Sequence, residues 1–281
     1  MPQIRNPQSA IPNRSGRSGT REWSEVSANC CTGCGHGCLY CYARQAALRF
    51  KKIAGPELWT QERPQYERLR GTPRRHKGVV MFPTQHDLTP FVWKAVGRDY
   101  LSKLLEAGNR VLVVSKAHED VMGELGSEFG RAPGNLLEVR VTITGCRPET
   151  RRLWEPGAPE YRERIAALKI IHKGGIPTSV SMEPCLDSLD IETMLASVMP
   201  WCHEVWIGMA NRLDQRLAWV RDAGLWSPEL GTAIARIKMR DWRLLADRVE
   251  RFCRACNTPP GWVQWKNEAA AAISAARGAQ P

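Results

Sequence analysis

The sequence has no apolar run approaching the roughly 20 residues that a helix needs to cross a bilayer, so it predicts no membrane partner. The first 21 residues also lack an apolar segment, which excludes a secretory signal and indicates a flexible basic N-terminal arm. We therefore expect a cytoplasmic protein. Disulfides are rare in that compartment, so the 10 cysteines are expected to be metal ligands, catalytic thiols or small buried residues.

Acidic residues are fewer than basic residues. The chain has 29 acidic and 40 basic residues, which gives a net charge of +11. Such an excess favours anionic partners, with DNA or RNA first among them. A soluble protein from a basic-biased genome would show the same excess, because arginine is spread widely along this chain. Charge alone therefore indicates association and not a specific site.

Internal repeats and low-complexity linkers are missing as well, which favours one main domain. Hydrophobic residues make up 43% of the chain, enough for a sizeable core, and the composition excludes a disordered or fibrous protein. We expect the arm over residues 1–21, a core over 22–215 and a helical C-terminal extension over 216–281 that packs on the core.

Short apolar runs alternate with amphipathic stretches through the core. Strands are expected at 79–82, 111–114, 137–144, 178–182 and 205–207, with a last short strand at 263–265. Helical spacing falls at 95–107, 118–128, 160–173 and 191–198, and one long helical pattern spans 230–252. About six strand–helix units indicate a parallel sheet with helices outside. They are too many for a small open sheet and slightly few for an eight-fold barrel, so the α/β fold class predicted is a partial (β/α)6 TIM-like barrel.

Five cysteines fall within twelve residues, from Cys30 to Cys41. Thiolates this dense repel one another unless a cation holds them. The sequence lacks the distant second knuckle of a zinc ribbon, which needs roughly 15–20 residues between two cysteine pairs. Here Cys31-x2-Cys34 and Cys38-x2-Cys41 are separated by three residues. One short loop with this spacing suits a single face of an iron–sulfur cubane, and the glycines at 33, 35 and 37 allow it to turn tightly.

The spacing Cys34-x3-Cys38-x2-Cys41 supplies three ligands, so one iron of a [4Fe–4S] cluster would have no cysteine. Such an open iron can bind and activate a substrate, whereas a cluster closed by four cysteines normally only carries electrons. A structural zinc site and a pure electron-transfer cluster are the alternatives. Cys30 and Cys31 are expected to be small buried residues at a strand end, although Cys31 would replace Cys34 in another register.

The stretch Gly33 to Arg44, Gly-Cys-Gly-His-Gly-Cys-Leu-Tyr-Cys-Tyr-Ala-Arg, resembles the signature loop of the radical S-adenosylmethionine (SAM) superfamily, with Tyr40 before the last cysteine. It is most similar to the loop of the spore photoproduct lyase-like branch. Residues 113–116 resemble the third strand of that branch. Residues 154–159, followed by 164–168, resemble its segment after the fourth strand. The resemblance covers residues 22–215.

The resemblance implies a barrel of the radical SAM type in which the open iron chelates the amino and carboxylate groups of SAM, near Tyr40. One-electron reduction by a donor such as flavodoxin or ferredoxin then gives methionine and a 5′-deoxyadenosyl radical, which removes a hydrogen atom from the substrate. The protein orients the cofactor and excludes competing chemistry, and the reaction would be of the lyase or transferase type.

Three functions follow as hypotheses. The first is an enzyme acting on nucleic acid, such as a pyrimidine photoproduct or a modified base. The second is an enzyme acting on a peptide or a small metabolite, which predicts a narrow, closed pocket. The third is a non-catalytic module that holds zinc or an iron–sulfur cluster as a structural clip.

Ligands of a parallel β/α barrel lie at the carboxyl ends of the strands, and this rule selects further residues. Thr84 follows the strand at 79–82, where the family has a Gly-Gly-Glu-like segment that is absent here. Residues 83–85 would replace it through their carbonyls and the Thr84 hydroxyl. Ser115 and Lys116 end the next strand, and Lys116 would meet the methionine carboxylate or a substrate phosphate. An ordinary polar loop or a solvated strand end is the alternative.

Three more candidates follow later strands. Thr144 is expected to hydrogen-bond the cofactor ribose, although β-propensity alone also explains a threonine there. Glu183 follows the apolar strand at 178–182 and is expected to contact ribose hydroxyls or a cationic group, with a surface salt bridge as the alternative. Asn211, after the strand at 205–207, is expected to make a similar contact, on weaker grounds. His86 and His118 are interpreted as plain polar residues.

Five cysteines remain outside the loop and its strand: Cys146, Cys185, Cys202, Cys253 and Cys256. Cys253-x2-Cys256 would suit a second metal only with further ligands, so two packed or exposed thiols are the simpler interpretation. Cys146 and Cys185 each lie just past a predicted strand end, which places them near the barrel mouth. A hydrogen-atom donor at one of them is the functional hypothesis, and a buried cysteine is the favoured one.

Overall fold

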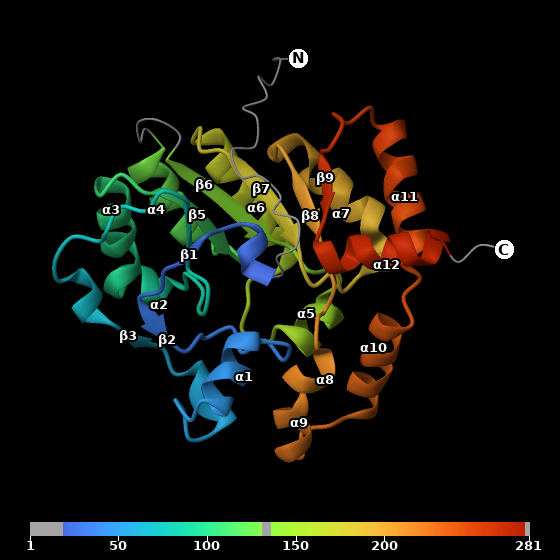
Figure 1. The fold of residues 1–281 in the computed structure, drawn as a ribbon, viewed down its shortest axis with the longest axis horizontal. Coiled ribbons are helices and arrows are strands. Elements are labelled where there is room, and N and C mark those ends of the chain that lie inside the picture. The colour runs from blue at the N-terminus through green and yellow to red at the C-terminus, as the bar shows by residue number, and fades with distance from the viewer. Residues whose placement is uncertain (1–18, 131–135, 279–281) are drawn as a thin grey trace.

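The structure is a computed structural model and describes residues 19–130 and 136–278. Within these ranges seven parallel strands form one sheet in the order β1-β4-β5-β6-β7-β8-β9 (Figure 1). The strands are β1 (Val26–Ser27), β4 (Val79–Phe82), β5 (Arg110–Ser115), β6 (Leu137–Thr142), β7 (Thr178–Met182), β8 (Val205–Ile207) and β9 (Val263–Trp265). Every strand predicted from the sequence is present within a few residues.

The sheet is open in the described chain, because β1 pairs only with β4 and β9 pairs only with β8. The mixed α/β class and the parallel order are therefore confirmed, whereas the partial barrel stays a prediction. A separate antiparallel pair, β2 (Cys31–Thr32) and β3 (Arg63–Pro64), follows β1. No helix in the described ranges is both long and apolar enough to cross a membrane.

Helices connect the strands and cover the sheet. They are α1 (Tyr42–Arg49), α2 (Pro90–Val92), α3 (Arg98–Glu106), α4 (Glu119–Phe129), α5 (Pro148–Trp154), α6 (Tyr161–Lys173), α7 (Ile191–Val198), α8 (Leu213–Arg216), α9 (Ala218–Asp222), α10 (Pro228–Lys238), α11 (Trp242–Ala255) and α12 (Asn267–Gly278). Short 3-10 segments lie at Gly19–Glu22, Pro56–Thr60, Tyr66–Leu69, Ser188–Asp190 and Met199–Trp201, and Trp93–Gly97 forms a π-helical turn before α3.

The long helical pattern at 230–252 is not one helix. It breaks after Lys238, and the Asp241 side chain caps a new helix by accepting a hydrogen bond from the Leu244 amide at 2.9 Å. An N-cap aspartate satisfies an otherwise unpaired amide of the first turn, which is why a new helix begins there. The single-helix prediction for this stretch is wrong in this respect.

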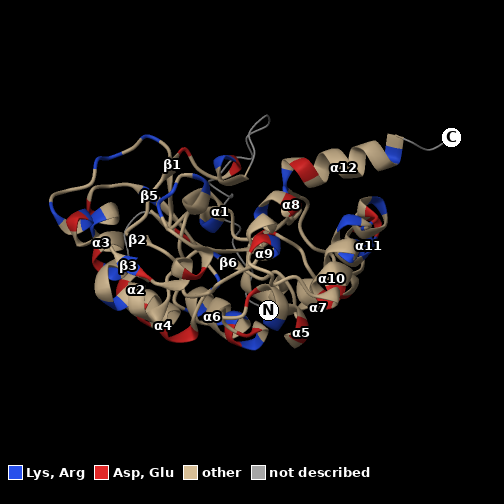
Figure 2. Ribbon diagram, turned by 90° about the horizontal axis from the view of Figure 1, so that it is seen from below, with Lys and Arg blue, Asp and Glu red and all other residues tan. Residues whose placement is uncertain are grey.

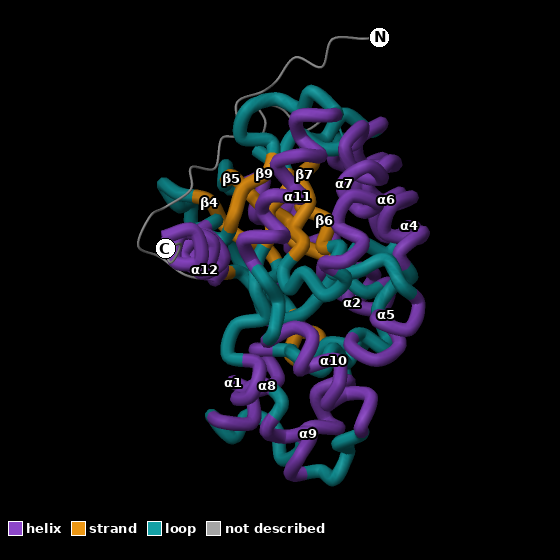
Figure 3. The backbone as a smooth tube through the Cα atoms, turned by 90° about the vertical axis from the view of Figure 1, so that its right-hand side faces the viewer, coloured by secondary structure: helices purple, strands orange, loops and turns teal. Residues whose placement is uncertain are grey.

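Two layers of helices position the candidate site. Helices α4, α6, α7 and α11 pack in succession along one face of the sheet, and α12 lies on the other side (Figures 1 and 3). Helices α1, α8, α9 and α10 gather beyond the carboxyl ends of the strands, at the bottom of both views. Helices α8, α9 and α10 form a second small hydrophobic core with the loop before α1, centred on Cys38, Tyr40, Trp154, Leu217 and Val220.

The C-terminal segment is more than a helical extension, because β9 extends the sheet beside β8. Lys266, directly after β9, is fully buried and donates to the Gly19 carbonyl at 2.6 Å. Its Nζ also lies 3.2 Å from the buried Glu22 carboxylate. The last residues of the predicted arm are thus packed against the C-terminal part of the sheet, while residues 1–18 lie outside the described ranges.

Candidate metal and cofactor site

The loop between β1 and α1 carries the predicted cluster cysteines and is tied to the segment after α5. The Leu39 amide donates to the Trp154 carbonyl at 2.9 Å, and the Gly157 amide donates to the His36 carbonyl at 3.0 Å. The segment 154–159, singled out by its resemblance, therefore fixes the backbone of the loop. Cys38 belongs to the second core, whereas Cys34 belongs to a separate small cluster with residues of α1.

Glycines allow the loop to turn, as its sequence predicts. Gly33 has a φ of +93° and Gly37 a φ of +60°, a region that favours glycine. A Cβ on Gly33 would lie 2.3 Å from the Gln61 carbonyl oxygen, so no side chain fits there. Gly35, the third predicted turning point, has no positive φ.

We expect Gly33→Ala to loosen this loop. The left-handed backbone costs an alanine about 1–2 kcal/mol, and the contact with Gln61 forces a further shift. The variant should unfold at a lower temperature and retain less iron per chain after anaerobic reconstitution. Gly123→Ala in α4 is the matched control, since a Cβ there meets nothing within 4 Å. Equal iron content and melting temperature in Gly33→Ala and the wild type would contradict this.

The three cysteines influence one another electrostatically. Cys34 and Cys38 are buried and Cys41 is half-buried. Burial raises the pKa of Cys34 well above its ordinary value, and Asp87, Cys38 and Cys41 add to the rise. Burial also raises the pKa of Cys38 to about 12, although Lys116 opposes it. Thiols with such pKa values stay protonated at neutral pH unless a metal displaces the proton.

Arg44, in the first turn of α1, lies against the cysteine loop, with its Nη2 beside Gly37. Its side chain is 3% exposed, and its Nε and Nη2 have no hydrogen-bond partner in the described part of the chain. The guanidinium lies 4.3 Å above the ring centre of Trp219. Burial lowers its pKa, and the charges of Cys41, Cys38 and Cys34 oppose that effect. A buried cation without a carboxylate partner beside three thiols indicates a site built for negative charge.

The geometry does not favour a single zinc ion at these cysteines. Sulfurs that share one zinc at about 2.3 Å lie roughly 4 Å apart. In the described ranges, two groups bring three ligand atoms within 4.8 Å of one another, and the three loop cysteines are not one of them: the groups are Glu138, His203 and Glu204, and Cys146, Asp187 and Asp190. Both are satisfied by neighbours, since Arg140 and Trp206 donate to Glu204, and two backbone amides donate to Asp187.

The remaining cysteines lie apart from the loop's three. Cys30 and Cys31 are buried at 0% and 2% exposure, as predicted, and Cys31 Sγ donates to a neighbouring carbonyl. Cys185 is buried in the main core, which favours the structural interpretation. Cys253 and Cys256, at the end of α11, belong to no ligand group in the described chain.

Glu155 joins three of the predicted cofactor residues. This carboxylate follows α5 and is 1% exposed. Tyr40 Oη donates to its Oε1, and Thr144 Oγ1 donates to the same oxygen at 2.9 Å. Arg164 Nη2 lies 2.5 Å from Oε2, and Lys116 Nζ lies 4.0 Å from Oε1. The signature loop, two strand ends and α6 therefore meet at one carboxylate.

The Glu155 network holds its charges in place. Burial alone would raise the pKa of Glu155, but Arg164, Lys116 and the Tyr40 hydroxyl outweigh it and lower the pKa to about 2. Burial likewise opposes the charge on Lys116, yet Cys38, Glu155 and Asp87 raise its pKa above the ordinary value. The carboxylate and both cations are therefore charged at neutral pH.

A second polar chain runs from beside the loop to the surface. Ser115 Oγ donates to Asp87 Oδ1 at 2.5 Å, and Asp87 Oδ2 lies 3.3 Å from His36 Nδ1. His36 Nε2 is 2.9 Å from His118 Nε2, and His118 Nδ1 is 3.3 Å from Glu163. His118 is thus part of a chain of polar groups, and its interpretation as a plain polar residue stays a prediction. Ser115 positions Asp87 in this structure.

Glu183 lies on the opposite side of the strand ends from the Glu155 network. Its carboxylate is 3.5 Å from Lys266 Nζ, the cationic partner that its position predicted. Burial raises its pKa, while Lys266 and Arg216 oppose the rise. Arg216 also lies 5.9 Å from the ring centre of Tyr42. Glu183 is therefore a half-buried ion-pair partner at the end of β7.

The other two predicted residues have different surroundings. Thr84 has its hydroxyl and carbonyl engaged already, since Asn29 Nδ2 donates to Oγ1 at 2.8 Å and Tyr42 Oη donates to the carbonyl oxygen. Asn211 is half-buried after β8 and has no hydrogen-bond partner among the residues described. The Asn211 side-chain amide therefore has more free hydrogen-bonding capacity than the other predicted cofactor residues.

The structure brings Tyr40, Lys116 and Thr144 together with the loop, and it connects Ser115 to the same region through Asp87. Sequence reasoning missed Glu155, Arg44 and Asp87 as site residues. Glu155 sits in the motif at 154–159 and Arg44 ends the signature stretch, so both carried a signal. Only tertiary packing shows that their charges meet at the same place.

No family model matches this chain, and no curated protein sequence does. Among solved structures, the chain is similar to the crystal structure of Streptococcus suis SuiB bound to S-adenosylmethionine, with a TM-score of 0.48 and 8% sequence identity. The alignment covers 83% of this chain and 44% of that one, so this chain spans less than half the length of the SuiB chain. The function is therefore argued below from the residues of the site.

Proposed function

We propose that this chain is a radical SAM enzyme whose [4Fe–4S] cluster is held by Cys34, Cys38 and Cys41. One observation carries the proposal. Three cysteines on one short loop lie beside the carboxyl ends of a parallel sheet, and the buried guanidinium of Arg44 lies against this loop without a carboxylate partner. Carboxyl ends of parallel strands are where ligands of α/β proteins bind.

The donor set fits the cluster. Thiolates are the usual ligands of iron–sulfur clusters, and three of them leave one iron open. Arg44 and Lys116 supply positive charge beside the cysteines, which suits an anionic cluster. When bound, the cluster supplies an electron that splits SAM into methionine and a 5′-deoxyadenosyl radical.

The chain's own residues would orient the cofactor and exclude water. Lys116, paired with Glu155 and next to the loop, offers a cation for the methionine carboxylate of SAM. Asn211 and Glu183 end neighbouring strands and offer polar groups for its ribose. Helices α8, α9 and α10 pack against the loop and shield it from solvent on the other side.

The proposal is tested by anaerobic reconstitution with iron and sulfide, followed by dithionite and SAM. We expect about four irons per chain, as in a [4Fe–4S] cluster, and release of 5′-deoxyadenosine. Zinc binding, or a cluster that never cleaves SAM, would instead support the non-catalytic module. The electron donor in the cell, such as flavodoxin or ferredoxin, is a separate proposal that the same assay tests by replacing dithionite.

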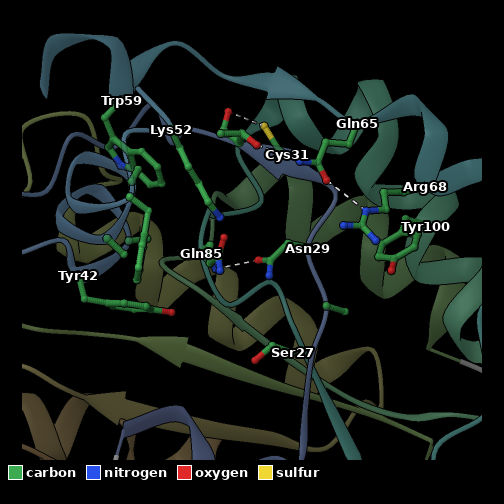
Figure 4. A pocket seen from close by; sticks show the side chains of 16 residues that line it. Ser27, Asn29, Cys31, Tyr42, Lys52, Trp59, Gln65, Arg68, Gln85 and Tyr100 are labelled. Atoms are coloured by element: carbon green, nitrogen blue, oxygen red, sulfur yellow. Dashed lines mark hydrogen bonds between the residues drawn. The ribbon is translucent and has the colours of Figure 1, made fainter. Parts of the chain in front are cut away.

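We further propose that the substrate is a nucleic acid, and a cavity beside the loop supports this. The cavity measures about 360 Å³, within the range of small-ligand sites, and lies between β2, α1 and the segment after β3 (Figure 4). Two cations and no carboxylate line it. Its other polar and aromatic groups come from Asn29, Gln65, Gln85, Tyr42, Phe50, Trp59 and Tyr100.

Cations that track a phosphate backbone and aromatic faces for base stacking are typical of single-strand nucleic-acid sites. Lys52 and Arg68 have no carboxylate within 4.0 Å among the described residues, although Arg68 Nε donates to Gln65. Further basic residues follow along the chain between β3 and β4, at Arg70, Arg74, Arg75 and Lys77. Figure 2 shows that Lys and Arg are also spread over the rest of the ribbon. A peptide or metabolite substrate would not need two cations and several aromatic rings around one cavity.

We expect the double variant Lys52→Glu, Arg68→Glu to bind a single-stranded oligonucleotide at least tenfold more weakly. The dependence of affinity on salt should also flatten, by about 0.7 in slope for each phosphate that the variant no longer neutralises. The double variant Arg236→Glu, Arg254→Glu is the control with the same change in net charge, because both arginines are exposed and neither lines the cavity. Unchanged affinity in the Lys52→Glu, Arg68→Glu variant, or an equal loss in the control, would contradict a nucleic-acid site at this cavity.

A further inference from the structure

Arg44 is buried and charged, and none of its acidic neighbours compensates it. The side chain is 3% exposed, and no described carboxylate lies within 4.0 Å of it. Its backbone amide donates to Cys41 Sγ at 3.4 Å, which places the residue one helical turn from the loop. Burying an unpaired charge is strongly destabilising, so its retention needs an explanation from nearby groups.

The negative partner that suits Arg44 is the sulfur set of the loop. Cys34, Cys38 and Cys41 would be negative as thiolates that hold a cluster, and their loop contacts Arg44 at Cys41 Sγ and at Gly37. Its Nη2 packs next to Gly37, where an added Cβ would lie 3.9 Å away. Stacking on Trp219 fixes the plane of the guanidinium and leaves its N–H groups free to donate.

We propose that Arg44 sets the reduction potential of the cluster, by donating hydrogen bonds to its sulfur atoms and placing a fixed positive charge beside it. This inference rests on the proposed cluster at Cys34, Cys38 and Cys41. A cluster held by three thiolates is anionic, and one-electron reduction adds negative charge. A nearby cation therefore stabilises the reduced form more than the oxidised form and raises the potential. Arg44 is a positioning residue here, because it acts through the cluster and not on the substrate.

The test is a redox titration of the reconstituted protein, with dithionite as the one-electron reductant and the reduced cluster counted by electron paramagnetic resonance. In Arg44→Gln the ratio of reduced to oxidised cluster at a fixed potential should fall at least tenfold, a midpoint shift of about 59 mV for one electron. Arg44→Lys keeps the charge, so its midpoint potential should lie between those of the wild type and Arg44→Gln. Arg49→Gln is the matched control, since it removes an exposed arginine from the same helix.

A second measurement does not require the glutamine variant to fold. Wild-type protein labelled with 15N at its arginine side chains should show a nitrogen coupling to the reduced cluster in pulsed electron paramagnetic resonance, and Arg44→Lys should lose it. Equal midpoints in Arg44→Gln and the wild type, or a wild-type cluster without arginine coupling, would overturn the inference. A wild-type protein that assembles no [4Fe–4S] cluster at all would instead overturn the proposed function.

Discussion

Replacing Cys38 with serine should abolish the reaction while leaving the fold intact. The variant loses one of three thiolates, so we expect less than a full complement of iron and sulfide after reconstitution. Release of 5′-deoxyadenosine should fall by roughly a hundredfold or more, since even changes outside the ligand shell cost about 10–100-fold. The measurements are iron and sulfide analysis and product release from SAM under dithionite.

Two other cysteines serve as controls for that variant. Cys202 is as buried as Cys38, at 7% exposure, but it belongs to the main core, so Cys202→Ser should keep both cluster and activity. Cys31→Ser tests the alternative register of the loop. If Cys31→Ser lost the cluster and Cys34→Ser retained it, the ligand assignment would be wrong. A fully active Cys38→Ser variant would contradict the proposed site altogether.

Glu155→Gln should destabilise the protein by about 3–5 kcal/mol at neutral pH, the range found when one partner of a buried ion pair is removed. The substitution keeps the size and the hydrogen-bond acceptor of the side chain. It leaves Arg164 and Lys116 without their shared carboxylate. Denaturant unfolding at pH 7 measures the loss. Glu160→Gln is the control, because its ion pair with Arg151 is more exposed and should be worth at most about 1 kcal/mol.

The same variant has a predictable pH dependence. The pKa of Glu155 is about 2 in the folded protein and 4.5 ordinarily, so its folded-state pKa is depressed. Stability from a depressed carboxylate is fully present above pH 4.5 and is lost as the pH falls towards 2. The stability difference between the wild type and Glu155→Gln should therefore shrink over that window. A difference that stays constant from about pH 5 to pH 2 would show that Glu155 does not carry this charge.

The sheet was readable from the sequence because its strands are buried on both faces. Runs such as Val79–Phe82 and Val205–Ile207 are continuously apolar and buried at every position, the pattern of central parallel strands. The helical pattern at 230–252 misled, because apolar spacing continues across a break that only the Asp241 cap reveals. The two-residue strand β1 is too short to give a periodic signal of its own.

Candidate site residues could be predicted where the signal lies within a short stretch of sequence. Cys34, Cys38 and Cys41 are identified by their spacing on one loop, and strand ends selected Lys116 and Thr144 by a topological rule. The partners of a charged side chain, by contrast, can lie far away in the sequence. Glu155 and Tyr40 are separated by 115 positions in the chain and meet only once the core is packed. The unpaired state of Arg44 is likewise a property of its packing and leaves no mark in the sequence.

The reduced, reconstituted protein gives the most direct test of the central claim, when its electron paramagnetic resonance spectrum is recorded with and without SAM. A [4Fe–4S] cluster with three cysteine ligands has one iron free to bind SAM, so we expect the spectrum to change shape when SAM is added. The change should be absent in Cys38→Ser and present in Cys202→Ser. A spectrum that is identical with and without saturating SAM would mean that the fourth iron is closed, and the radical SAM function would be contradicted.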